Sequence, residues 1–432
     1  MNLVLEAIQK HDPARLALIG DTQRYTYGEL KTQIDQRTKA LSEVSVLGLA
    51  LDNGPDWILW DLAAAQANIP CVPLPPFFTK KQVLHSLQSA GVSHILSTEG
   101  LRDTGTEREG ILPKHTAKVT FTSGTTGSPK GVCLSQEGLE QVACSIVEVL
   151  GAELADKHIS VLPLAILLEN VAGVYAALLA GGTVYAPSLK TIGFANPFQP
   201  DFTALSQYMA KHEITSAILV PELLRGFMAS QPQIPSLKFL AVGGSKVSPA
   251  LISAAREMGL PVYEGYGLSE CGSVVAMNTP QDNRPGSVGK ILPHIQLTEE
   301  NNEIIIKNPA FLGYLGAAHQ DAFPTGDLGY LDADGFLHID GRKKSILITS
   351  YGRNIAPEWV EGALQAQPEI FKSKVYGDGE AFLSAEIVPS SPQVNIEQAI
   401  NRANAELPEY AHIKNFQIIT KEKAHELLQK AG

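Results

Sequence analysis

The sequence predicts an α/β fold: a large N-terminal domain of stacked βα units with a small antiparallel β layer, followed by a small α+β C-terminal domain. From Ala17 to about Tyr263, short apolar runs alternate with segments of helical periodicity, which is typical of βα units around a largely parallel sheet. Beyond Gly286, short strands and tight turns replace this pattern. After the basic run at 342–344, about ninety residues combine strand and helix patterns.

The βα region shows individual strand and helix signals. We expect strands at Val46–Leu51, Ser93–Leu96, Ile159–Leu162, Ala217–Val220 and Phe239–Val242. Thr26 followed three residues later by Glu29 predicts a capping box at a helix start. Ser248 followed by Pro249 predicts an N-cap with proline at the first helical position.

The second half of the chain predicts a boundary between two domains. A chain of 432 residues is longer than one compact core usually holds. The segment YLDADGFLHID predicts a hairpin that turns at Asp334-Gly335. We place the boundary near Lys344, which gives an N-terminal domain at 1–343 and a C-terminal domain at 344–432.

The composition argues for a folded protein that does not bind nucleic acid. Apolar residues make up 44% and charged residues 18%, and the net charge is -11 with no evident basic patch, which disfavours contact with a phosphate backbone. The four cysteines, Cys71, Cys133, Cys144 and Cys271, are widely spaced and do not match metal-ligand patterns. We therefore expect reduced thiols and a cytoplasmic protein.

Neither a secretion signal nor a membrane span is expected. The first residues carry Glu6 where a signal peptide would be basic. The most apolar segment, Val171–Pro187, is interrupted by Gly181-Gly182, so a buried helix followed by a strand explains it better than a membrane span.

The stretch VTFTSGTTGSPKGVCLS, residues 119–135, has the composition of a phosphate-binding loop. An apolar strand leads into Thr122, Ser123, Gly124, Thr125, Thr126, Gly127, Ser128, Pro129, Lys130 and Gly131. Glycines let backbone N–H groups surround phosphate oxygens, hydroxyls add hydrogen bonds and a lysine adds a point charge. The pattern GxxxxGK[ST] does not fit, because proline stands where it needs glycine. The alternative is a flexible polar hairpin.

This loop and three later motifs together resemble the adenylate-forming superfamily of acyl-CoA synthetases, peptide-synthetase adenylation domains and beetle luciferases. The later motifs are AVGGSKVSP at 241–249, YEGYGLSECG at 263–272 and TGDLGYLDADGFLHIDGRKK at 325–344. The four occur in the order of that family, and the resemblance extends over nearly the whole chain, most like an acyl-CoA synthetase or fatty acid ligase.

The resemblance implies roles for individual residues in an ATP site. Tyr266, between Gly265 and Gly267, would stack on adenine, as a flat ring beside glycines allows. Ser269 would contact phosphate, and Glu270 would hold Mg2+, a cation that prefers oxygen ligands. Residues further along the chain complete the implied site: Asp327 for the ribose hydroxyls, Arg342 for ribose or α-phosphate, and Lys344 as the hinge of a mobile C-terminal domain.

The acyl pocket is implied by Gly243 and Gly244 and by the segment after Leu164. There the chain has Ala165, Ile166, Leu167 and Leu168 and lacks the aspartate with which α-amino-acid activators bind the ammonium group. An apolar acyl or aryl acid is favoured. The alternative is that Leu167 and Leu168 belong only to a helix core.

The reaction that the resemblance implies is ATP-dependent activation of a carboxylic acid to an acyl adenylate, with release of pyrophosphate. A thiol, of coenzyme A or of carrier-protein pantetheine, then displaces AMP. Lys130 and Mg2+ would neutralise charge. The resulting enzyme is an AMP-forming acid–thiol ligase; the alternatives are an acyl-carrier-protein ligase or a catalytically reduced nucleotide-binding homologue with a regulatory or binding role.

Two features depart from the family pattern. The family's C-terminal catalytic lysine follows a glycine, whereas this chain ends FQIITKEKAHELLQKAG, in which Lys430 lies at about the expected distance without that glycine. The region from Leu101 to Ala117 is also shorter than is usual.

Overall fold

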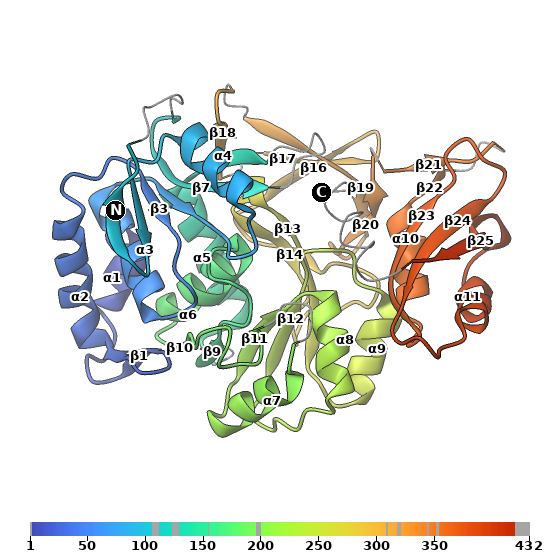
Figure 1. Ribbon diagram of the computed structural model, residues 1–432, viewed down its shortest axis with the longest axis horizontal. Coiled ribbons are helices and arrows are strands. Elements are labelled where there is room, and N and C mark those ends of the chain that lie inside the picture. The colour runs from blue at the N-terminus through green and yellow to red at the C-terminus, as the bar shows by residue number, and fades with distance from the viewer. Residues whose placement is uncertain are drawn as a thin grey trace.

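The computed structural model describes residues 2–105, 112–122, 129–153, 155–195, 200–307, 310–317, 321–343, 345–350 and 354–419. Two large mixed sheets make up the N-terminal part, with a four-stranded antiparallel sheet beside them and the C-terminal unit beyond it (Figure 1). The predicted α/β architecture with a small antiparallel layer and an α+β C-terminal unit is confirmed.

The larger sheet has nine strands in the order β15-β14-β13-β12-β11-β9-β10-β1-β2. Its members are β1 (Leu16–Ile19), β2 (Arg24–Thr26), β9 (Lys157–Ile159), β10 (Thr183–Tyr185), β11 (Ser216–Leu219), β12 (Phe239–Val242), β13 (Val262–Leu268), β14 (Ser273–Met277) and β15 (Lys290–Ile291). The strands from β13 to β1 pair in parallel. The connections between β10 and β11, β11 and β12, and β12 and β13 contain the helices α7 (Phe202–Lys211), α8 (Pro221–Ala229) and α9 (Pro249–Glu257), respectively.

The second sheet has seven strands in the order β18-β8-β7-β4-β3-β5-β6. They are β3 (Leu47–Leu49), β4 (Cys71–Pro73), β5 (His94–Ser97), β6 (Gly100–Asp103), β7 (Thr116–Thr122), β8 (Lys130–Ser135) and β18 (Phe311–Tyr314). The helices of this part of the chain are α1 (Leu3–Ile8), α2 (Tyr27–Ala40), α3 (Pro55–Ala67), α4 (Lys80–Ala90) and α5 (Gln136–Leu150).

The apolar segment that the sequence predicted to be a buried helix followed by a strand comes after β9 and ends in β10 of the nine-stranded sheet. It forms the π-helical segment η1 (Leu168–Tyr175), the short helix α6 (Ala176–Leu179) and then β10. This prediction is confirmed. Among the described residues, no helix combines the length and the apolarity needed to cross a bilayer.

The antiparallel layer consists of β16 (Gln296–Glu300), β17 (Glu303–Lys307), β19 (Ala322–Leu331) and β20 (Leu337–Arg342). The predicted hairpin joins β19 to β20, and its Gly335 has φ 81°, a conformation that favours glycine. The Asp332 carboxylate accepts the N–H groups of Asp334 and Phe336, each at 3.0 Å. This side chain therefore satisfies the backbone of the turn.

The C-terminal unit packs α10 (Pro357–Gln365) and α11 (Ile396–Ala405) on one small sheet. That sheet has three strands, β23 (Ile370–Tyr376), β24 (Leu383–Pro389) and β25 (Ile413–Ile418). The strands β21 (Leu347–Ile348) and β22 (Asn354–Ile355) of the same unit form a separate pair. Its buried residues form an apolar cluster of their own, from Ile355 to Ile413. We keep the boundary near Lys344 as a proposal, since Lys344 lies outside the described residues.

Most predicted strands are present with shifts of one or two residues at their ends, but Ile159–Leu162 is wrong. The strand there is β9, which ends at Ile159. Beyond it the backbone bonds to a side chain: Asn53 Nδ2 donates to the Leu162 carbonyl at 2.9 Å, and Asn53 Oδ1 accepts the Leu164 N–H at 2.8 Å. A distant asparagine thus replaces the neighbouring strand.

Both predicted helix starts are present. Thr26 N donates to Glu29 Oε2 at 2.8 Å and the capping box forms. Ser248 occupies the N-cap position before Pro249. Its side chain makes no capping bond, however, so the proline and the backbone geometry mark this start.

A buried ion pair connects strand β7 to helix α3. Lys118 on β7 lies 2.8 Å from Asp61 Oδ1 on α3, with side chains 3% and 1% exposed. Tyr175 Oη and Asn170 Nδ2, both on η1, donate to Asp61 Oδ2 at 2.7 and 3.1 Å. Lys118 also donates to the Asn170 side chain. One charged cluster therefore fixes β7, α3 and η1 relative to one another.

Replacing Lys118 by methionine should destabilise the fold strongly. The substitution leaves the Asp61 carboxylate buried without a counter-charge, which typically costs about 3–5 kcal/mol. Urea unfolding of the Lys118→Met variant measures this loss. Lys31→Ala is the control, because Lys31 forms an exposed pair with Asp35 at 2.8 Å and such pairs are worth under about 1 kcal/mol. Equal midpoints for both variants would contradict the assignment.

Candidate active site

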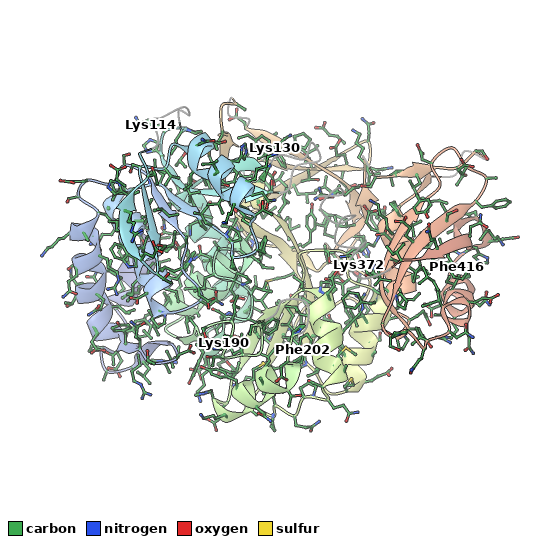
Figure 2. The ribbon with its side chains drawn as sticks, viewed as in Figure 1. Lys114, Lys130, Lys190, Phe202, Lys372 and Phe416 are labelled. Carbon is green, nitrogen blue, oxygen red and sulfur yellow. The ribbon has the colours of Figure 1, made fainter. Side chains whose placement is uncertain are left out.

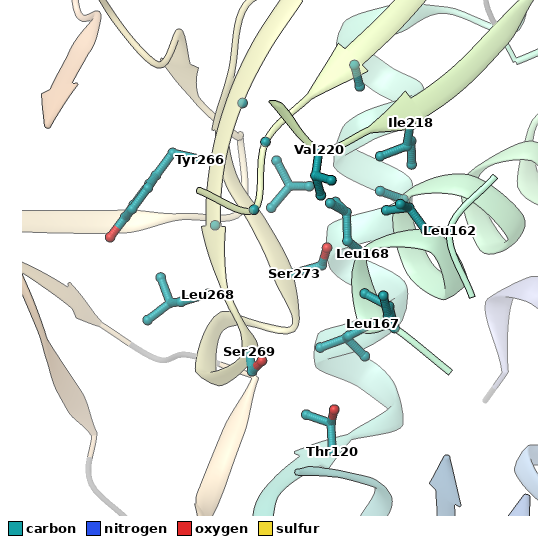
Figure 3. Close-up of a pocket in the computed structure, with 18 of the residues that line it drawn as sticks. Thr120, Leu162, Leu167, Leu168, Ile218, Val220, Tyr266, Leu268, Ser269 and Ser273 are labelled. Atoms are coloured by element: carbon teal, nitrogen blue, oxygen red, sulfur yellow. The ribbon is translucent and has the colours of Figure 1, made fainter. Parts of the chain in front are cut away.

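The ends of both large sheets and of the antiparallel layer surround one cavity of about 1180 Å³. Figure 3 shows part of it, with Tyr266 on one side and a group of apolar side chains on the other. The cavity has a polar end beside β8, β13 and β20, and an apolar end beside η1, β11 and β12. The same cavity can therefore hold a polar ligand group at one end and an apolar ligand group at the other.

The candidate phosphate loop connects β7 to β8 at the polar end of this cavity. Thr122 and Lys130 pair across the two strands and both line the cavity. The predicted residues Ser123, Gly124, Thr125, Thr126 and Gly127 lie outside the described residues, so their roles remain predictions.

The end of the loop is supported by a side chain that the sequence did not indicate. His85 on α4 lies with Nε2 3.0 Å from the carbonyl oxygen of Pro129. A carbonyl only accepts hydrogen bonds, so Nε2 carries the proton in this contact. The bond connects α4 to the residue just before Lys130.

Asp327 connects the two predicted nucleotide-binding motifs. Tyr266 Oη donates to Asp327 Oδ2 at 2.5 Å, and Arg342 Nε forms an ion pair with Oδ1 at 2.9 Å. Asp327 is buried whereas Arg342 is 60% exposed. Burial, and next the negative Asp327, raise the pKa of the Tyr266 hydroxyl far above its usual range, so the hydroxyl stays protonated and donates. Each carboxylate oxygen can accept a second bond, which leaves capacity for a ligand diol.

Glu270 lies in the short 3₁₀ helix η2 (Ser269–Cys271) and faces the same cavity. Tyr314 Oη on β18 donates to Glu270 Oε1 at 2.8 Å, and Lys130 Nζ lies 5.6 Å from the centre of the Tyr314 ring. Burial, together with Glu270, raises the pKa of the Tyr314 hydroxyl. Tyr314 therefore stands between the predicted cation and the predicted carboxylate, and neither motif pointed to it.

The described residues suit a magnesium ion only if the substrate and water supply most of its ligands. In the described part of the chain, no group of three or more His, Cys, Asp or Glu side chains could hold a metal by itself. Mg2+ commonly takes one or two carboxylates together with substrate phosphates and waters. Glu270 at the polar end of the cavity suits that arrangement.

The apolar end contains the predicted acyl-pocket residues. Leu167, Leu168, Gly243 and Gly244 all line the cavity. A Cβ on Gly243 would lie 2.8 Å from the Gly265 carbonyl oxygen, so glycine permits this close approach of β12 to β13. Leu167 is also part of the main apolar core, so the pocket and the core interpretations of this leucine both hold.

The cavity brings together most of the predicted site. Its walls include Gly265, Tyr266, Gly267, Ser269, Glu270 and Arg342 besides the residues above. Asp327 is not among the described residues that line the cavity, but it contacts Tyr266 and Arg342, which do. Lys344 and Lys430 lie outside the described residues, and their hinge and catalytic roles remain predictions.

Glu264, next to these residues on β13, is a buried carboxyl that sequence reasoning missed. Burial raises its pKa to about 8, and nearby Lys246 offsets part of this rise. No local pattern could have indicated this, since the side chain's burial depends on the packing of neighbouring strands.

Comparisons with known proteins agree with this geometry. The AMP-binding enzyme family matches residues 5–110 and 100–304. The chain is similar to a 2-succinylbenzoate–CoA ligase of Bacillus velezensis, at 27% identity over 413 residues, 84% of this chain and 82% of that protein. It is 30% identical over 346 residues to an oxalate–CoA ligase of Arabidopsis thaliana, covering 73% of this chain and 65% of that protein.

Among solved structures, the fold is shared with an o-succinylbenzoate CoA synthetase of Bacillus subtilis in complex with its acyl-adenylate intermediate. The TM-score is 0.80 at 23% identity, and the match covers 97% of this chain and 94% of that chain.

Glutamine at position 264 should flatten the pH dependence of stability. Between pH 4.5 and about 8 the folded protein holds a proton on Glu264 that the unfolded chain has released. The stability from this group is thus present below pH 4.5 and is lost as pH rises through 8, at up to about 1.4 kcal/mol per pH unit.

Urea unfolding of the wild type and of Glu264→Gln at several pH values between 5 and 8.5 measures the difference. The gap in unfolding free energy should shift in favour of the variant as pH rises, whereas Glu148→Gln, at an exposed position, should track the wild type. A gap that is independent of pH contradicts the assignment.

Proposed function

Because the chain belongs to the AMP-binding enzyme family, we propose that it activates a carboxylic acid with ATP and transfers the acyl group to a thiol, with coenzyme A as the acceptor. One observation carries this proposal: Lys130, Tyr266, Glu270 and Arg342 converge on a cavity that continues into an apolar pocket. The named CoA ligases among the relatives support the same reaction class.

In the first half-reaction, a carboxylate oxygen of the acid attacks the α-phosphorus of ATP. The bond to the bridging oxygen breaks, and pyrophosphate leaves with the electron pair. Two anions must approach each other, so catalysis consists mainly of positioning and of neutralising charge. Lys130 at the end of the phosphate loop and Arg342 on β20 supply positive charge. Mg2+, held by Glu270 and the phosphates, would supply further neutralisation.

The nucleotide is held by groups whose geometry is already fixed. The Tyr266 ring stands between Gly265 and Gly267, where no side chain competes with a stacked base. Its hydroxyl is held by Asp327, so the ring is oriented before a ligand enters. Asp327 has remaining acceptor capacity for the ribose hydroxyls.

In the second half-reaction, the thiol attacks the acyl carbonyl carbon and AMP leaves. We propose that the C-terminal unit turns about Lys344 between the two halves. The acid is an apolar or aryl one, since the acyl end of the cavity is walled by leucine and glycine. A carrier-protein pantetheine is the alternative acceptor. The four cysteines are free thiols, in line with the expected cytoplasmic location.

Acid-dependent exchange of labelled pyrophosphate into ATP tests the first half-reaction. The protein is incubated with Mg-ATP and a panel of aliphatic, aryl and dicarboxylic acids. Exchange with at least one acid is expected, and thioester formation on adding coenzyme A or a pantetheine-loaded carrier protein then identifies the acceptor. An absence of exchange across the panel, with ATP binding retained, would favour a catalytically reduced binding protein.

Asparagine at position 327 should weaken ATP binding by about 2–3 kcal/mol, the worth of charge-assisted hydrogen bonds. Isothermal titration with ATP measures the loss. Tyr266→Phe is the matched variant: it removes the hydroxyl that bonds to Asp327 but keeps the ring. It should cost about 1 kcal/mol. A change well under 1 kcal/mol for Asp327→Asn contradicts the ribose assignment.

Alanine at position 430 tests the proposed adenylating lysine. If Lys430 contacts the reacting phosphate, the adenylation rate should fall by about two orders of magnitude. Thioester formation from preformed acyl adenylate should be largely retained. Lys423→Ala in the same stretch is the control. An unchanged adenylation rate in the Lys430→Ala variant removes this residue from the mechanism.

A further inference from the structure

Ser273, the first residue of β14, lines the acyl end of the cavity, and its hydroxyl is buried. The residue is 7% exposed. Within the part of the chain that the structure describes, its Oγ makes no hydrogen bond. In Figure 3 its side chain points toward Leu168, and β14 packs against η1, to which Leu168 belongs. Ser273 therefore lies in the wall of the space that an acyl group would occupy, with its hydroxyl beside Leu168.

The backbone at this position makes the serine more unusual. Ser273 has φ 135°, a conformation that residues with a Cβ adopt only at a cost. Its carbonyl lies so close to β13 that a Cβ on Gly267 would be 1.8 Å away from it. Glycine at position 273 would remove both the backbone strain and the unsatisfied hydroxyl. The chain instead keeps a serine there, although its hydroxyl gains no hydrogen bond from the described residues that would offset the backbone strain.

Another serine at the acyl end of the cavity already has a partner. Ser216 also lines it, but its Oγ lies 3.1 Å from His158 Nδ1. His158 Nε2 in turn lies 2.8 Å from Glu169 Oε1. Ser216, His158 and Glu169 therefore meet one another's hydrogen-bonding needs. A Cβ on Gly173 would lie 2.5 Å from both His158 and Glu169, so glycine in η1 makes room for these side chains. Ser273 has no such partner.

We propose that Ser273 is a specificity residue, which hydrogen-bonds one uncharged polar group, a hydroxyl or a carbonyl oxygen, on an otherwise apolar acid. This inference rests on the proposed function and narrows its substrate class. The group is uncharged because the neighbouring walls, such as Leu162, Ile218 and Val220, are apolar. The cationic side chains that line the cavity among the described residues, Lys130, Arg342 and Lys343, belong to its polar end. A charge beside Ser273 would lose its hydration without a counter-ion.

The test compares acids in matched pairs. Pyrophosphate exchange is measured with octanoate and its positional hydroxy and oxo isomers, and with 3-phenylpropanoate and its ring-hydroxylated and oxo derivatives. The wild type should prefer one isomer over its unsubstituted parent by about tenfold in kcat/KM, the usual worth of one hydrogen bond to a buried group. A wild type that does not discriminate any isomer from its parent overturns the proposal.

Ser273→Ala and Ser273→Gly separate the hydroxyl from the backbone strain. Both should abolish the preference by slowing the favoured isomer about tenfold, with the parent acid within about twofold. Thermal unfolding should show both variants at least as stable as the wild type. Ser160→Ala is the control, because Ser160 Oγ is also buried without a partner but does not line the cavity; its preference should be that of the wild type.

Two further outcomes are decisive. Equal slowing of every acid by Ser273→Ala assigns the hydroxyl to the reacting carboxylate and overturns the proposal. If no acid supports exchange, thermal shift by the same acids without ATP distinguishes the two claims. A shift that is selective for one isomer and lost in Ser273→Ala supports the role of Ser273 even though the proposed function fails, whereas unselective shifts contradict both.

Discussion

The buried charge of Lys118 is the constraint on which the cavity depends. Its ammonium group is removed from water and is compensated by Asp61, with Asn170 and Tyr175 completing the hydrogen bonds. Such a pair is favourable only in a narrow geometry, because the loss of hydration is large. Strand β7, which leads into the proposed phosphate loop, and η1, whose Leu168 lines the cavity, are consequently held in place relative to one another.

A second buried carboxylate, Asp327, connects two elements at the proposed nucleotide end of the cavity. It joins Tyr266 on the large sheet to Arg342 at the end of the antiparallel layer. Arg342 is exposed on its other side and lies just before the proposed hinge. The proposed nucleotide contact of Arg342 and the proposed hinge are therefore neighbours in the chain.

The outcome of individual sequence predictions follows the range of the interactions involved. The Thr26–Glu29 capping box was predictable because it needs only four consecutive residues. The strand at Ile159–Leu162 was predicted wrongly because Asn53, more than a hundred residues away, takes over the backbone hydrogen bonds. Tyr314 and Glu270 are 44 positions apart, so no motif could have joined them. The motif residues Tyr266 and Glu270 were found from short strings, although their contacts were not.

The sequence by itself determined the fold class, the family and the residue types of the nucleotide end. Those depend on local periodicity and on short motifs whose chemistry is contained in consecutive side chains. Only the tertiary structure decided which groups are buried, which are paired and which remain available. The raised pKa of Glu264 and the Ser273 hydroxyl, which has no hydrogen-bond partner among the described residues, both belong to this second kind. Burial and hydrogen-bond satisfaction are properties of the packed surroundings, which come from segments far apart in the chain.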